Sequence, residues 1–143
     1  MKVLFVCRGN VGRSQMAEAL FHKLSPKNHA DSAGTNVDNP GETIGERADN
    51  VPAAADVLDI MRAEEGLDLS DKKRTQLTKE MLSDYDRVIV IISEPEFIPD
   101  WLSASIKYEQ WSIDDPRGKS KEELRKTKDE IKDLVKILLG GIT

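Results

Sequence analysis

One short stretch of this 143-residue chain, CRGNVGRS at residues 7–14, holds a thiol and a guanidinium group in a glycine-containing segment. Cys7 is the only cysteine in the chain, and Arg13 follows it within the same stretch. Glycines let successive backbone N–H groups turn inward around an anion, and Arg13 can bind two oxygens of a tetrahedral oxyanion at once. These surroundings favour the thiolate, so the pattern predicts that Cys7 is a nucleophile beside an oxyanion site.

The serine after Arg13 adds to this prediction. Ser14 is placed to hydrogen-bond the thiolate and later to help it leave. The plainer alternative is that a lone cysteine is a small buried hydrophobic residue, and that a cysteine and an arginine at this spacing occur by chance. The glycines, the serine, a strand before the segment and a helix after it together favour the functional interpretation.

A second candidate for chemistry lies in SIDDPRG, residues 112–118. A phosphoester leaving group needs a proton, and the group that donates it can later activate water. Asp115 precedes Pro116, which stiffens the turn and would hold a carboxylate over a bound anion. The alternatives are that the segment is an ordinary turn, or that Asp114 is the acid.

Apolar periodicity and turn residues divide the chain into alternating strands and helices. Strands are predicted over residues 2–6, 29–35, 86–92 and 106–113. Helices are predicted from Ser14 to Pro26, over 54–61 with Gly66 as C-cap, over 79–82, and from Leu124 to Leu138 with Gly140 and Gly141 past the end. Residues 36–50 are expected to be a loop, and residues 93–102 a short helix or turn.

This alternation predicts one α/β domain over residues 1–143, a three-layer αβα sandwich around a four-stranded parallel sheet. In such sheets, ligands bind outside the carboxyl ends of the strands, at the loops that lead into helices. The segment 7–14 follows the first strand, and Asp115 follows the last. Both groups are therefore expected at the same end of the sheet.

Composition limits the partners of this chain. Its net charge is -5, which argues against a nucleic-acid or anionic membrane surface, so any bound anion must be held by local groups. No apolar stretch approaches membrane-spanning length, and His22 and His29 lack metal-ligand spacing, so neither a metal nor another cofactor is expected. One cysteine cannot form an internal disulfide, which suits a reducing cytoplasm.

VLFVCRGNVGRSQMAEAL, residues 3–20, resembles the low-molecular-weight protein tyrosine phosphatases and the arsenate reductases that share their fold. SAGT at residues 32–35 and DP at 115–116 fall in the order of that family, and the similarity covers nearly the whole chain. The resemblance implies the phosphotyrosine phosphatase I-like fold. It also implies a phosphate-binding loop made by Arg8, Gly9, Asn10, Val11, Gly12 and Arg13.

The resemblance further assigns a role to each matching side chain. Cys7 would attack phosphorus while Arg13 binds the equatorial oxygens. Asn10 would brace the loop, Ser14 would stabilise the thiolate, and Asp115 would protonate the leaving oxygen. Arg8, directly after the nucleophile, either faces the pocket mouth and selects acidic substrates or is simply exposed to solvent.

The chain departs from the family pattern in two places. Many of these phosphatases carry an aromatic wall soon after the Asp-Pro pair, where this chain has Arg117 and Gly118. Thioredoxin-linked reductases of this fold use further cysteines, but this chain has none, and Gly12 stands where many relatives have one. RSQMAE, residues 13–18, looks more like the reductase branch.

The sequence therefore predicts a cytoplasmic phosphomonoesterase that forms a phosphoenzyme on Cys7. Its substrate would be a phosphorylated protein or a small aryl phosphate such as phosphotyrosine. The first alternative is an arsenate reductase that uses an external small thiol. The second is a non-catalytic oxyanion or phosphoprotein binder, which would need neither Cys7 nor Asp115.

Overall fold

Four parallel strands form the centre of the computed structural model, which describes residues 1–142. Their order across the sheet is β2-β1-β3-β4, so β1 lies inside the sheet with a neighbour on each side. The strands are β1 (Lys2–Cys7), β2 (His29–Gly34), β3 (Arg87–Val90) and β4 (Tyr108–Gln110). The single-domain α/β fold with a four-stranded parallel sheet is thus confirmed.

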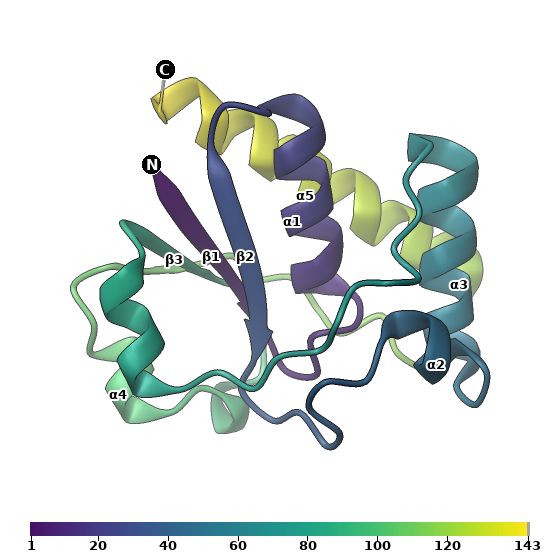
Figure 1. Cartoon of the computed structure of the whole chain (residues 1–143), viewed down its shortest axis with the longest axis horizontal. Helices are drawn as coiled ribbons and strands as arrows, with labels where there is room; N and C mark the ends of the chain where they lie inside the picture. Colours follow the sequence, from purple (N-terminus) through teal and green to yellow (C-terminus); the bar gives the residue numbers. More distant parts are fainter. Residues whose placement is uncertain (143) are drawn as a thin grey trace.

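Helices cover both faces of this sheet, which gives the three layers predicted (Figure 1). The helical elements are α1 (Arg13–Leu24), α2 (Ile44–Ala48), α3 (Pro52–Ile60), η1 (Met61–Glu65), η2 (Lys79–Asp84), η3 (Pro95–Phe97), α4 (Asp100–Ser103) and α5 (Lys121–Ile142). Helices α1, α3 and α5 pack on one face, while η2 and α4 pack on the other. No helix among residues 1–142 combines the length and the apolarity needed to cross a membrane.

The alternation of side chains along β1 explains these two layers. Val3 and Phe5 belong to the apolar cluster under α1 and α5, whereas Leu4 and Val6 belong to the cluster under η2 and α4. Successive side chains of a strand point to opposite faces, so a strand with helices on both faces must be apolar throughout. This explains why the continuous apolar run at the start of the chain forms a central strand.

Three expectations from the sequence differ from the structure. The predicted loop over 36–50 contains α2, whose start carries a capping box between Thr43 and Glu46. Strand β4 is only three residues long. Helix α5 continues through Gly140 to Ile142, because Ile142 still packs against the core and this contact outweighs the low helix propensity of glycine.

The order of the strands also locates a crevice at their carboxyl ends. Strand β1 leads into α1 on one face of the sheet, while β3 leads toward α4 on the other face. The two chain segments diverge at this point, and ligands of open α/β sheets bind where such a divergence occurs. The segment after β1 is the one that holds Cys7 and Arg13.

A buried cluster of charges ties η1 to α1 and α5. Glu65, whose side chain is 2% exposed, lies 2.9 Å from each of Lys23, Lys128 and Lys132. Burial by itself would raise the pKa of Glu65, but hydrogen bonds from Lys132, Lys128 and Lys23 outweigh it and lower the pKa to about 2. The carboxylate is therefore a brace between three helical elements.

We expect Glu65→Gln to lower the free energy of unfolding by on the order of 3 kcal/mol at pH 7, because Lys128 then stays buried with less compensation. The pKa is lower in the folded state than in the unfolded chain, so the stabilisation by Glu65 is complete above the ordinary value of 4.5 and is lost as the pH falls from 4.5 to about 2. Urea unfolding at pH 7 and pH 3 measures this difference.

The exposed Glu130→Gln is the matched control and should change stability by less than about 0.5 kcal/mol. A Glu65→Gln deficit of the same size at both pH values would contradict this account of the cluster.

Candidate active site

The segment between β1 and α1 presents a run of backbone donors without protein acceptors. Cys7 is the last residue of β1, and Gly12 caps α1 with no side-chain hydrogen bond. Among the described residues, no protein group accepts a hydrogen bond from the backbone N–H groups of residues 8–15. Unpaired amides of this kind, next to the positive end of a helix dipole, are the usual partners of a bound anion.

Asn10 holds this loop in shape. It is fully buried and has a φ of 54°, in the left-handed region that asparagine tolerates better than most residues. Its Nδ2 donates to Ser14 Oγ at 2.8 Å and to Ser32 Oγ at 3.0 Å, while its Oδ1 accepts from Thr75 N at 2.8 Å. The side chain therefore faces the interior and connects the loop to three other segments.

Ser14 lies directly beside the thiol. Its Oγ is 3.0 Å from Cys7 Sγ, and both residues are buried. Because Asn10 already donates to Ser14 Oγ, the serine hydroxyl proton is free to point to the sulfur. A hydroxyl donor at this distance stabilises a thiolate more than a thiol.

The Arg13 guanidinium is held in place from several sides. It is 3% exposed, and its Nη1 donates to the Ile113 carbonyl oxygen at 2.8 Å. Its Nη1 lies 3.6 Å from Glu94 Oε2, and its Nη2 lies 3.8 Å from Asp115 Oδ2. Glu94 Oε2 has no hydrogen-bond partner among residues 1–142, and its one ion pair within that range is with Arg13.

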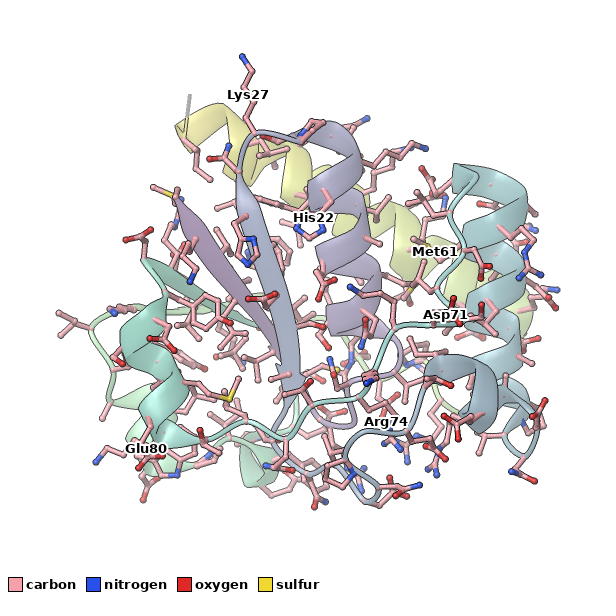
Figure 2. The ribbon with its side chains drawn as sticks, viewed as in Figure 1. His22, Lys27, Met61, Asp71, Arg74 and Glu80 are labelled. Atoms are coloured by element: carbon pink, nitrogen blue, oxygen red, sulfur yellow. The ribbon has the colours of Figure 1, made fainter. Side chains whose placement is uncertain are left out.

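Arg74, a residue that sequence reasoning missed, lines the cavity beside the loop and is labelled in Figure 2. Its Nε and Nη2 both donate to the Gly9 carbonyl oxygen, at 3.1 and 2.9 Å. Its Nη1 pairs with Glu42 at 2.7 Å and with Asp38 at 2.8 Å, and the hydrogen bond from Arg74 lowers the pKa of Asp38. Arg74 therefore holds the loop through a carbonyl group and occupies none of its N–H groups.

A cavity of about 110 Å³ joins the loop to the turn that holds Asp115. Cys7, Arg13 and Asp115 all line it, whereas Asp114 is exposed and does not. Arg117 N donates to Asp115 Oδ1 at 2.9 Å, which leaves Oδ2 on the side of Arg13. The geometry therefore favours Asp115 over its neighbour as the carboxyl group near a bound anion.

The remaining predicted residues divide into two groups. Gly9, Val11 and Gly12 line the cavity, as a loop around an anion would. Arg8 does not, because its guanidinium stacks on the Phe97 ring at 3.8 Å from the ring centre. Across the described residues, no group of three or more His, Cys, Asp or Glu side chains is arranged to hold a metal ion.

Comparison with known proteins relates this site to a family. The family model "Low molecular weight phosphotyrosine protein phosphatase" matches residues 2–143. Arsenate reductase 2 of Staphylococcus haemolyticus is 31% identical over 130 residues, which cover 91% of this chain and 89% of that protein. The structure of a low molecular weight protein tyrosine phosphatase from T. tengcongensis aligns with a TM-score of 0.81 and 27% identity, covering 99% of each chain. An arsenate reductase in a phosphate-binding state aligns with a TM-score of 0.75 and 27% identity, over 99% of this chain and 98% of that one.

The close approach of β2 to the loop generates a test. A Cβ on Gly34 would lie 2.7 Å from the Arg8 carbonyl oxygen and 3.0 Å from Asn10 N. We expect Gly34→Ala to displace the loop, to lower the free energy of unfolding by about 1–3 kcal/mol and to weaken phosphate binding by about tenfold or more. Urea unfolding and isothermal titration calorimetry with inorganic phosphate measure both effects.

Gly140→Ala serves as the matched control, since a Cβ there has nothing within 4 Å and lies in α5. It should stabilise the protein by up to about 1 kcal/mol and leave phosphate affinity unchanged. Normal phosphate affinity in Gly34→Ala would show that the loop does not depend on this contact.

Proposed function

Because this chain belongs to the low molecular weight phosphotyrosine protein phosphatase family, we propose that it is a phosphomonoesterase that hydrolyses aryl phosphates through a cysteinyl-phosphate intermediate on Cys7. The observation that carries the proposal is the run of unpaired amides over residues 8–15 next to the Cys7 thiol. The same cavity is lined by the Asp115 carboxyl group. A nucleophile, an oxyanion site and an acid are the parts that this reaction needs.

The first step is attack on phosphorus by the Cys7 thiolate, which the Ser14 hydroxyl stabilises at 3.0 Å. The loop amides and the Arg13 guanidinium hold the equatorial oxygens of the phosphoryl group. The bond from phosphorus to the leaving oxygen breaks, and Asp115 gives that oxygen its proton. The products are a free phenol and phosphorylated Cys7.

The second step releases phosphate. Asp115, now a carboxylate, takes a proton from water, and the water oxygen attacks the phosphorus of phospho-Cys7. The sulfur leaves as a thiolate, again stabilised by Ser14. A simple anion-binding module would need neither the thiol nor the carboxyl group, so their presence in one cavity counts against that alternative.

Arsenate reduction is the second candidate, because the same loop suits any tetrahedral oxyanion and because arsenate reductases are among the relatives. Cys7 is the only cysteine, so the chain cannot present an internal disulfide to a reductant. Any reduction would require an external small thiol. This requirement favours the phosphatase as the main activity.

We propose phosphorylated proteins or small aryl phosphates as the substrates and the cytoplasm as the location. A single free thiol with a reactive role suits a reducing compartment. The roles of Cys7, Arg13, Ser14 and Asp115 as catalytic groups belong to this proposal.

The purified protein should release phosphate from an aryl phosphate, and Cys7→Ser should lose about a thousandfold or more of this activity. The same variant should still bind inorganic phosphate, because the amides and Arg13 remain. Phosphate release and calorimetry measure the two properties. Efficient arsenate turnover by the same sample with thioredoxin alone, and no hydrolysis of aryl phosphate, would overturn the proposal.

The identity of the acid has its own test. Asp115→Asn should slow hydrolysis by roughly a hundredfold for phenols that are poor leaving groups, and much less for activated phenols, which need little protonation. Steady-state rates over a series of substituted phenyl phosphates measure this dependence. Asp114→Asn is the neighbouring control and should show neither effect; the reverse result would transfer the role to Asp114.

A further inference from the structure

The turn that carries Asp115 also presents two cations at the cavity. Lys119 N donates to the Pro116 carbonyl oxygen at 3.1 Å, and Gly118 has a φ of 79°, so residues 116–119 form a tight turn of type II. Arg117 and Lys119 both line the cavity. The Nη2 atom of Arg117 lies 3.6 Å from the point where a Cβ on Gly9 would be, which places this guanidinium beside the anion loop.

The other cavity arginines outside the loop are already neutralised. Arg74 pairs with Asp38 and Glu42, and Arg47 contacts the same two carboxylates at 3.0 and 3.8 Å. These four side chains form a network with two positive and two negative charges. Arg74 braces the loop at Gly9, and the four charges together sum to zero.

Arg117 and Lys119 are not neutralised in this way. Lys119 has no ion pair within residues 1–142, and the single acid near Arg117 is Asp115, at 3.9 Å from its Nε. Asp115 is also shared with Arg13. To protonate a leaving oxygen, Asp115 must be neutral, and Arg117 then has no negatively charged partner among the described residues.

An apolar surface lies at the opposite end of the loop. Val57 Cγ2 is 3.9 Å from the point where a Cβ on Gly12 would be, and Val51, Ala54 and Leu124 line the cavity with it. Asp56 is the one acid on this α3 side. The cavity therefore has an apolar wall beside Gly12, the Arg117 guanidinium beside Gly9, and Lys119 as a further cation in its lining.

From this asymmetry we infer that the preferred substrate is an aryl phosphate whose organic part carries a second negative charge, which Arg117 and Lys119 bind. The inference rests on the proposed phosphatase activity. The aromatic ring packs on the Val57 side, and a carboxylate attached to it pairs with Arg117, whose one acidic neighbour among the described residues carries no charge at this stage of the reaction. Arg117 thus determines specificity through the leaving group, whereas Arg13 acts on the phosphoryl oxygens.

The test compares two substrates that differ only in charge: 3-(4-phosphooxyphenyl)propanoate and its amide. Two methylene groups separate the charge from the ring, so the phenols leave equally well. We expect kcat/KM to be about fivefold higher for the carboxylate than for the amide, which is the upper range for a partly exposed ion pair. This ratio of the two kcat/KM values should decrease with added salt. The double variant Arg117→Gln/Lys119→Gln should bring this ratio close to one. The single variant Arg117→Lys keeps the positive charge and should keep part of the preference.

Lys126→Gln removes the same charge from an exposed position on α5 and should keep the full ratio. An unchanged ratio in the double variant, or a ratio of one in the unaltered protein, would overturn the inference. A second arm uses phosphotyrosine peptides with Asp or Asn after the tyrosine, which distinguishes an acidic peptide from a small carboxylated phosphate as the source of the charge.

Calorimetry with the matching carboxylated and amidated arylphosphonates separates this inference from the proposed function. Tighter binding of the carboxylate without turnover of any phosphate would refute the phosphatase and leave the charge preference intact. Turnover of both phosphates with equal binding of the two phosphonates would support the phosphatase and refute the charge preference.

Discussion

The shape of the loop over residues 8–14 depends on Asn10, whose backbone conformation is unusual. Asn10 takes a φ of 54°, and its buried amide side chain bonds to Ser14, Ser32 and the Thr75 amide. The N–H groups on either side of Asn10 have no acceptor among the described residues. The same side chain fixes the hydrogen-bond direction of Ser14, and through it the environment of the thiol. The Cys7 thiol and the unpaired amides of the loop are therefore both positioned through Asn10.

Such a loop is costly by itself, because its amides lack protein partners. The surrounding structure holds it by contacts that do not use those amides. Arg74 binds the carbonyl side of the loop at Gly9, and Gly34 lets β2 approach its backbone closely. An oxyanion bound there would accept hydrogen bonds from these amides, and those bonds would contribute to its affinity. The buried brace at Glu65 lies elsewhere and contributes stability without contact with the site.

The relation to both phosphatases and arsenate reductases follows from this design. Phosphate and arsenate are both tetrahedral oxyanions, so the same loop, guanidinium and thiolate can serve either reaction. What separates the activities lies outside the loop: further cysteines for a disulfide relay, or a wall and an acid suited to an organic leaving group. This chain has one cysteine, and its cavity is bordered by Asp115 and Arg117. These surroundings are the basis on which we propose an organic phosphate as the substrate.

Local sequence determined much of this protein. The apolar run before Cys7 predicted β1, the periodicity after Arg13 predicted α1, and Gly66 has the left-handed backbone expected of a helix C-cap. The pattern of cysteine, glycines and arginine also predicted the loop, because every part of it comes from one continuous segment. Even α2 could have been found from its capping box between Thr43 and Glu46.

Only the tertiary structure decided which distant groups reach that segment. Arg74, Glu94 and Gly34 lie far from the loop in the chain, and nothing in their local sequence indicates that they contact it. The Arg8 side chain stacks on Phe97 of η3 and does not line the cavity, which depends on how η3 packs beside the loop. Hydrophobic periodicity reports which face of an element is buried, but it carries no information about which side chains from separate elements meet. Which side chains meet depends on strand order and register, and these are fixed only when the whole sheet packs against the helices on both of its faces.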